Sequence, residues 1–212
     1  MNENNNGRGL FYGVIGVATL IVAIIGATFA YFSVNASITN NNNIAGSTVE
    51  LSDTTIAGTL TRVTPSTVSM VPLKTEELQK GITGEGNQKC IDENGAKVCD
   101  IYTLTINNTS NAPVSLAGNL NITATDMTDL RWSLLKNTTS AEGAIAKEVG
   151  NTEIVANELL AAKTGTKTYH FVIWFNETEL NQNAQAGKSY TGTVTFTAAN
   201  GGKITAQFSS GS

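Results

Sequence analysis

Hydrophobic and polar residues separate along this chain into one long apolar run and a following region of short alternating segments. The run, Leu10–Ala30, reads LFYGVIGVATLIVAIIGATFA and carries no charge. Its 21 residues, at about 1.5 Å per residue, form a helix of roughly 32 Å, which is long enough to cross the core of a bilayer. The pattern therefore predicts an N-terminal hydrophobic helix that inserts into a membrane.

Two interpretations of this helix stay open. It is a permanent membrane anchor, or it is a signal peptide cleaved between Ala30 and Tyr31, where the small residues Thr28 and Ala30 suit a signal peptidase. Arg8 is the nearby positive charge, and the positive-inside rule places this end of the chain in the cytoplasm. Under both interpretations we expect residues 31–212 to be exported and to lie at the cell surface or outside the cell.

Alternation with a period of two begins at Tyr31, in the segment YFSVNASI. A strand here would present one apolar face. That face would consist of Phe32, Val34, Ala36 and Ile38. The run Asn40–Asn43 follows and predicts a flexible joint. We therefore expect a helix at residues 1–30, a strand and joint at 31–45, and a folded domain at 46–212.

Short alternating segments separated by turn residues continue to the end of the chain, and this arrangement is typical of an all-β sandwich or barrel. The predicted strands are 47–52, 54–63, 66–71, 97–106, 114–123, 130–135, 167–175, 189–198 and 203–209. Two segments have helical character. Thr75 is placed to cap a short helix over 75–81, whereas 151–159 is apolar enough to form either a helix or a strand.

The charge balance argues against a nucleic-acid partner. The chain has 13 Lys and Arg against 17 Asp and Glu, a net charge of −4, and only 14% of its residues are charged. Nucleic-acid binding requires a clustered basic surface, and this sequence has none. Uncharged Thr, Asn and Gly fill the deficit, which favours strands and turns.

The two cysteines flank Asn94-Gly95, a dipeptide that favours two-residue hairpin turns. With that turn, Cys90 faces Cys99 in a non-hydrogen-bonded pair, whose Cα atoms approach to about 4.5 Å. This separation lies within the range that a disulfide accepts. The same register places Asp92 opposite Lys97. We therefore predict a Cys90–Cys99 disulfide, which an exported compartment permits.

Catalytic and metal-binding patterns are missing from the sequence. His170 is the only histidine, and two thiolates with one distant imidazole do not complete a metal site. Asp126 and Asp129 lack the spaced oxygen ligands of a calcium loop. No nucleophile, phosphate-binding or zinc-protease motif is present. We expect no catalytic residue, no metal site and no cofactor, and do not expect an enzyme.

Three segments of the sequence resemble the TasA/camelysin family of exported Gram-positive proteins. The first, ATFAYFSVNASITNNNNIAGSTVELS, joins a small-x-Ala site at Thr28 and Ala30 to the aromatic pair Tyr31-Phe32. The others are YTLTINNTSNAPVSL and TYHFVIWFNETELNQNAQAGKSYTGTVTFTA. The resemblance implies a jelly-roll or immunoglobulin-like sandwich, processing by a dedicated signal peptidase, and assembly of some members into biofilm-matrix fibres through a freed N-terminal strand.

Three functions follow from these patterns and the resemblance. The first is a structural fibre subunit, which self-associates when Phe32, Val34, Ala36 and Ile38 insert into a neighbour's sheet. The alternative is a surface or adhesin-like domain that keeps Leu10–Ala30 as a membrane tether and does not polymerise. The third is a surface metallopeptidase, as some camelysin-type members are classed, although this chain shows no ligand set for it.

Overall fold

The computed structural model describes residues 12–20, 39–44, 48–53, 55–64, 70–83 and 89–210. The chain divides into two compact units, Met1–Ala36 and Ser37–Ser212. In the first unit, residues 12–20 form a helix. Its large apolar side chains are all exposed: Tyr12, Val14, Ile15, Val17 and Leu20. Within the described ranges, no helix is both long and apolar enough to span a bilayer.

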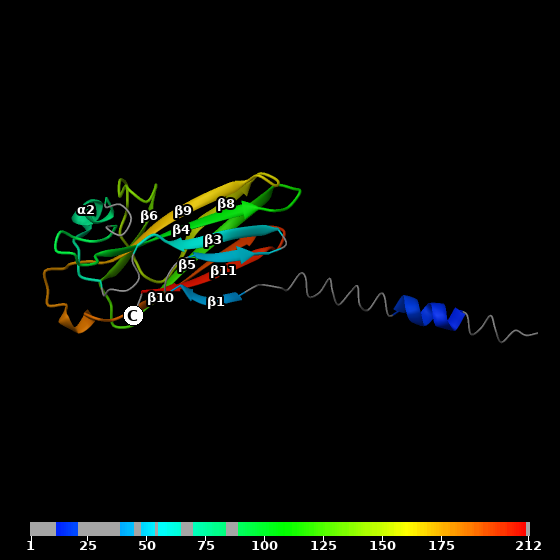
Figure 1. The fold of residues 1–212 in the computed structure, drawn as a ribbon, viewed down its shortest axis with the longest axis horizontal. Coiled ribbons are helices and arrows are strands. Elements are labelled where there is room, and N and C mark those ends of the chain that lie inside the picture. The colour runs from blue at the N-terminus through cyan, green and yellow to red at the C-terminus, as the bar shows by residue number, and fades with distance from the viewer. Residues whose placement is uncertain are drawn as a thin grey trace, which may run out of the picture. The chain divides into compact units, whose positions relative to one another are not determined.

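The second unit is a β-sandwich of two sheets (Figure 1). The five-stranded sheet has the order β1 (Thr39–Ile44), β11 (Lys203–Ser209), β10 (Tyr190–Ala198), β5 (Val114–Ala124) and β8 (Asn151–Leu160). The six-stranded sheet has the order β2 (Thr48–Ser52), β3 (Ile56–Arg62), β4 (Cys99–Asn108), β9 (Thr166–Phe175), β6 (Leu130–Leu135) and β7 (Lys147–Glu148). Among the described residues of this unit, the helical segments are η1 (Thr75–Glu77), α2 (Leu78–Ile82) and η3 (Asn183–Gln185). The prediction of an all-β sandwich with short helices is confirmed.

The main core lies between the two sheets and is built from alternate residues of each strand. In β10, Val194 and Phe196 are buried, whereas the intervening threonines are more exposed. Aromatic rings connect the two sheets at the centre of this core. The ring of Tyr102 on β4 lies 4.6 Å from that of Phe208 on β11 and 5.1 Å from that of Phe171 on β9, measured between centroids. Buried and more exposed residues therefore alternate along these strands with the predicted period of two.

A second apolar cluster covers the outer face of the six-stranded sheet at one end. Its members are Leu73, Leu78, Ile82, Cys90, Val98, Cys99, Ile101, Leu135, Val172 and Trp174. The odd-numbered residues at the start of β4 thus pack under α2, while the even-numbered ones face the main core. Both faces of the sheet are therefore apolar at this end of the sandwich, and α2 with the segment that contains the two cysteines covers the outer face. We call this end of the sandwich the disulfide end.

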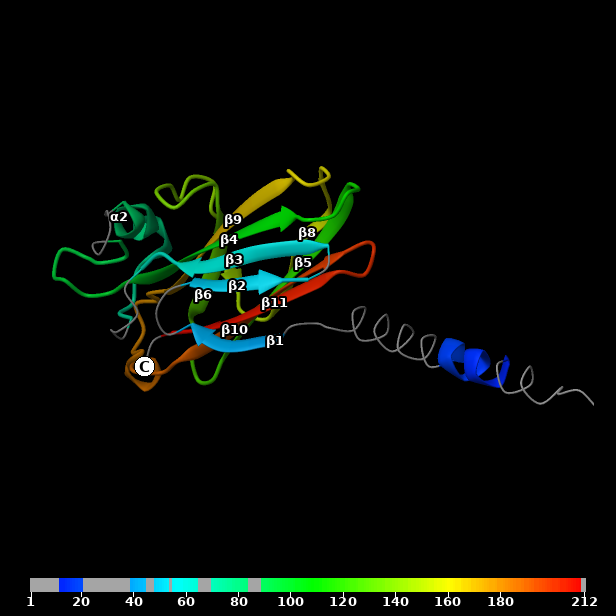
Figure 2. The ribbon, with the colours of Figure 1, turned by 45° about the vertical axis from the view of Figure 1, so that its right-hand side comes forward.

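The N-terminal edge of the sandwich differs from the prediction. Asn40–Asn43, predicted as a flexible joint, lie in β1, which pairs with β11 and is the parallel edge strand of an otherwise antiparallel sheet. Asparagine is depleted in strands, but main-chain pairing with an existing edge overrides that propensity. β2 begins four residues after β1 ends and belongs to the other sheet, so β1 and β2 lie along the same side of the sandwich (Figure 2).

Three further segments can be compared with the sequence predictions. Residues 151–160 form strand β8, not a helix, and pair with β5 through a register that shifts twice. The short helix near Thr75 is present, but Thr75 is its first residue and not its cap. The Thr75 hydroxyl instead donates to Oδ1 of Asn176, 2.8 Å away. Of the predicted strand 66–71, the described part forms only an isolated bridge at Met70.

Candidate functional site at the disulfide end

Cys90 and Cys99 form a disulfide, with their Cα atoms 4.9 Å apart. Both residues are fully buried in the second apolar cluster. Cys99 is the first residue of β4, and Cys90 precedes the hairpin that leads into it. The bond therefore joins the two ends of residues 90–99, which we call the disulfide hairpin, and the main-chain N–H of Cys90 donates to the carbonyl of Gly81 on α2.

The predicted register of this hairpin is wrong by one residue. The main-chain N–H of Asp92 donates to the carbonyl of Ala96 at 2.8 Å, and Ile91 pairs with Lys97. The loop therefore has three residues instead of two. The N–H of Gly95 donates to the carbonyl of Asp92 at 3.0 Å, and Gly95 has a φ of +79°. This geometry is a turn followed by a glycine bulge, a common alternative to the two-residue loop.

The Asp92 side chain explains the longer loop. Its Oδ1 accepts hydrogen bonds from the main-chain N–H groups of Asn94 at 3.0 Å and Ala96 at 2.7 Å. Aspartate commonly stabilises turns in this way. The predicted attraction between Asp92 and Lys97 is absent, because Lys97 is buried against Asp100. Cys90 reaches Cys99 with a φ of 56°, and its carbonyl accepts the N–H of Val98.

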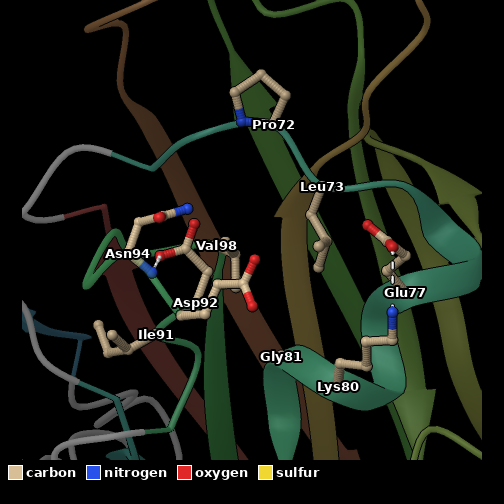
Figure 3. A pocket seen from close by; sticks show the side chains of 10 residues that line it. Pro72, Leu73, Glu77, Lys80, Gly81, Ile91, Asp92, Asn94 and Val98 are labelled. Carbon is tan, nitrogen blue, oxygen red and sulfur yellow. Dashed lines mark hydrogen bonds and ion pairs between the residues drawn. The ribbon is translucent and has the colours of Figure 1, made fainter.

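A groove of about 460 Å³ lies between α2 and the disulfide hairpin (Figure 3). Its size falls within the range of ligand pockets, about 300–1,000 Å³. The lining residues are Pro72, Leu73, Glu77, Lys80, Gly81, Ile91, Asp92, Glu93, Asn94 and Val98. Figure 3 shows Glu77, the last residue of η1, and Lys80 on α2, on the opposite side of the groove from Asp92 and Asn94. The groove thus combines apolar side chains with three carboxylates and one ammonium group.

A buried charged cluster lies at the same end, within the sandwich. The carboxylate of Asp100 on β4 is completely buried. Its Oδ1 lies 2.8 Å from Nζ of Lys97 and 3.6 Å from Nε of Arg62, and it accepts the hydroxyl of Thr64 at 2.9 Å. Its Oδ2 accepts the hydroxyl of Tyr190 at 2.7 Å. A charge buried this deeply is stable only when it is paired and hydrogen-bonded, as Asp100 is.

The same cluster holds the last residues of β11. The Arg62 guanidinium and the Tyr102 hydroxyl both donate to the carbonyl of Ser209, the Tyr102 hydroxyl at 3.2 Å. The main-chain N–H of Tyr190 donates to the Ser210 hydroxyl at 3.0 Å. Since Arg62 and Tyr102 belong to one sheet and Tyr190 and Ser209 to the other, the cluster fastens the two sheets together.

The buried environment shifts the pKa values of these groups. Burial lowers the pKa of Lys97, although the Asp100 charge opposes this shift. Burial and then the Asp100 charge raise the pKa of Tyr190 well above its ordinary value, and they raise that of Tyr102 in the same way. Both tyrosines therefore stay protonated at neutral pH and serve as hydrogen-bond donors. The cluster has two basic side chains and one carboxylate, all of them buried.

Other chemical candidates from the sequence lie apart from one another. His170 is half-buried on β9, with Nδ1 2.9 Å from the Thr103 hydroxyl, and burial lowers its pKa. The Asp129 carboxylate accepts the side-chain amides of Gln182 and Gln185, whereas that of Asp126 faces Lys188. In the part of the chain that the structure describes, no three His, Cys, Asp or Glu side chains group as metal ligands would.

The predicted processing and strand-addition residues lie outside the described residues. They are Ala30, Tyr31, Phe32, Val34, Ala36 and Ile38. The structure begins again at β1, whose first residue, Thr39, pairs with Thr205, and whose last, Ile44, pairs with Phe208. β1 therefore runs toward the disulfide end, where Ser209 and Tyr102 meet.

The comparisons with known proteins give no functional assignment. No protein-family profile matches the chain, and no curated protein matches it. Among solved structures, a FixG-related protein from Vibrio parahaemolyticus is 13% identical over 52% of this chain and 76% of its own, with a TM-score of 0.24. A sugar phosphate isomerase of the cupin superfamily from Silicibacter pomeroyi is 12% identical over 68% and 85%, with a TM-score of 0.14. With such low TM-scores, neither likeness informs the function.

Proposed function

We propose that this chain is an exported structural subunit of a cell-surface or extracellular-matrix fibre. In the fibre, the segment Tyr31–Ile38 of one copy adds as a strand to the next copy. The observation that carries the proposal is the direction of β1. This strand runs parallel to β11 and toward the disulfide end, so its first residue, Thr39, lies on the side away from that end (Figure 1). The segment that precedes β1 is therefore attached away from the disulfide end.

This direction suits a repeating assembly. A contact between one end of a subunit and the other end of the next is heterologous, and such contacts build open filaments when they do not close into rings. Strand addition supplies main-chain hydrogen bonds, and alternate side chains supply specificity. The apolar alternation of Phe32, Val34 and Ile38 provides those side chains.

Three observations support export. The helix of residues 12–20 exposes every large apolar side chain, with Tyr12 at 69% and Leu20 at 60%, which suits a helix that contacts lipid. The Cys90–Cys99 disulfide is typical of oxidising compartments. The resemblance of residues 27–60 to the TasA/camelysin family points to the same location and to fibre formation.

The proposal is tested with the secreted chain. Its N-terminal residue is sequenced, and its assembly is followed by light scattering and electron microscopy. We expect Tyr31 as the first residue, and fibres that disappear in the variant Phe32→Ser, Val34→Ser, Ile38→Ser, because its polar side chains no longer gain from burial. The matched control, Ser33→Ala with Ser37→Ala, changes the opposite face of the same strand and should assemble normally.

Two results would contradict the proposal in different ways. Fibres that survive the triple serine substitution would show that the segment is not the connecting strand. An intact N-terminus at Met1, with no assembly, would favour the second candidate, a membrane-tethered surface domain. The exposed apolar side chains of residues 12–20 are the observation that favours this candidate, because a retained anchor needs a lipid-facing surface.

A further inference from the structure

We propose that the groove between α2 and the disulfide hairpin receives the processed N-terminus of a neighbouring copy, binding its α-ammonium group and the side chains of Tyr31 and Phe32. The inference rests on the proposed function, because it requires cleavage before Tyr31 and contact between copies. It adds the acceptor site and the chemistry of recognition, which the direction of β1 does not specify.

The groove has a mixed lining, in which a few apolar side chains lie among polar and charged ones. Leu73 and Val98 are buried side chains at its wall, and Ile91 is half-buried beside them. Figure 3 shows Leu73 between the helix side and the hairpin side of the groove. Apolar pockets with a few polar groups bind ligands that bury aromatic or aliphatic side chains and fix one polar end. An aromatic pair such as Tyr31-Phe32 is a ligand of this kind.

The charges around the groove select a cation. Three carboxylates, those of Glu77, Asp92 and Glu93, line the groove together with a single ammonium group, that of Lys80. Glu77 and Lys80 form an ion pair at 3.3 Å, and Asp92 is engaged by the turn. Glu93 forms neither a hydrogen bond nor an ion pair with the part of the chain that the structure describes. It is therefore the carboxylate available to an incoming positive charge.

The processed chain carries the complementary group. Cleavage after Ala30 creates an α-ammonium group, with an ordinary pKa of about 7.7–8.0, directly before two aromatic residues. The uncleaved chain has a neutral amide at the same position. The next residues, Ser33–Ile38, carry no charge, so the ammonium is the only cation of the segment. Charge complementarity thus makes processing a condition for binding.

The direction of β1 suits a contact between copies better than one within a copy. The groove lies at the disulfide end, whereas Thr39 begins β1 on the side away from that end. Eight extended residues span at most about 29 Å, and within one copy they would have to reverse direction and run back along β1 to reach the groove. If copies are placed end to end, the disulfide end of the next copy, which carries the groove, lies next to the segment Tyr31–Ile38 of the first copy.

The binding test uses a fluorescent octapeptide and the secreted chain. The peptide has the sequence YFSVNASI with a C-terminal label, and the receptor is the non-assembling variant Phe32→Ser, Val34→Ser, Ile38→Ser. Fluorescence anisotropy should show saturable binding. Acetylation of the peptide's amino group should weaken it by about tenfold, which corresponds to about 1.4 kcal/mol.

The matched receptor variants are Glu93→Gln and Glu153→Gln. Glu93 lines the groove, and its substitution should weaken the free-amine peptide by about threefold while leaving the acetylated peptide unchanged. Glu153 is an exposed carboxylate on β8, and its substitution should change neither affinity. A difference between the two peptides that depends on Glu93 identifies the ammonium as the recognised group.

Three outcomes are decisive. The groove is not the acceptor if the free and acetylated peptides bind equally, or if the Glu93 and Glu153 variants have equal effects. Either result would overturn this inference even if fibres still require Phe32 and Val34. No peptide binding, with fibres that still depend on the segment, would also place the acceptor elsewhere. Fibres that ignore the segment would remove the proposed function itself, a result distinct from the other two.

Discussion

The hydroxyl of Tyr190 lies 2.7 Å from Oδ2 of Asp100, and this hydrogen bond joins the two sheets of the sandwich through fully buried groups. Tyr190 opens β10 and Asp100 lies near the start of β4, so the bond connects the ends of strands that are distant in the sequence. Lys97 and Arg62 surround the same carboxylate. The end of the molecule that carries the groove is thus held by an electrostatic tie in addition to the disulfide.

Replacement of Asp100 by Asn should strongly destabilise the protein. The substitution keeps the side chain's shape but leaves Lys97 and Arg62 buried without their counter-charge. Breaking a buried ion pair by removing one partner costs about 3–5 kcal/mol. Urea denaturation followed by circular dichroism measures the free energy of unfolding of both proteins.

The control for Asp100→Asn is Glu142→Gln, which breaks an ion pair with Lys136 that is mostly exposed. Exposed pairs contribute little, so we expect a change below about 1 kcal/mol. Similar losses in the two variants would show that Asp100 does not act as a buried counter-charge.

The protein should lose stability in alkali above about pH 10. Burial raises the pKa of Tyr169 to about 12, and burial with the Asp100 charge raises those of Tyr102 and Tyr190. A group with a higher pKa in the folded state contributes its full stabilisation below the unfolded value, about 10 for tyrosine, and loses it as the pH rises further. The lowered pKa of Lys97 acts in the opposite direction, but it is one group against three.

The measurement for this prediction is urea denaturation between about pH 9 and pH 11, together with a titration of tyrosinate absorbance. The absorbance of the buried tyrosines should rise only as the protein unfolds. A free energy of unfolding that stays constant across this range would contradict the raised pKa values.

The strands were largely predictable because their alternation reflects burial directly. In β10 and β11, every second residue faces the core, as the sequence pattern requires. β1 was not predictable, because four consecutive asparagines carry no pattern and the strand depends on main-chain pairing with β11. β8 was ambiguous for a related reason: it is an exposed edge strand with a shifted register, so its apolar residues do not alternate strictly.

The sequence predicted the disulfide but missed the charged cluster. The register prediction failed because it ignored the Asp92 side chain, which stabilises a longer turn. A signal for the cluster was nevertheless present. Arg62 follows Leu60 in the core-facing phase of β3, and Asp100 precedes Tyr102 in the core-facing phase of β4. Opposite charges at core-facing positions of neighbouring strands indicate a buried ion pair.

Gly192→Ala should disturb the centre of the core. A Cβ atom at this position of β10 would collide with the ring of Phe208. Phe208 also packs against Tyr102 at 4.6 Å and Phe171 at 5.4 Å, so the ring has little room to move. Overpacking of this kind costs about 1–3 kcal/mol, which thermal or urea denaturation measures.

Two controls define the cause of that loss. Thr193→Ala, on the other face of the same strand, should cost less than about 1 kcal/mol. Adding Phe208→Leu to Gly192→Ala should cost less than the sum of the two single substitutions, because the smaller side chain leaves space for the new methyl group. Strict additivity would show that the ring and the methyl group do not meet.

The disulfide should resist reduction in the folded protein and stabilise the capped end. Both cysteines are fully buried, so a reductant reaches the bond only when the cap of α2 and the hairpin opens. Trp174, the strand partner of Cys99, reports this opening through its fluorescence, since a nearby disulfide quenches an indole. We expect thiol labelling only when reductant and denaturant are combined, whereas denaturant alone should raise the fluorescence, because unfolding separates Trp174 from the disulfide. The variant Cys90→Ala, Cys99→Ala should lose about 2–3 kcal/mol, as expected for a short closed loop. Rapid labelling with reductant alone would mean that the cap opens freely in the native state and that the bond does not hold it.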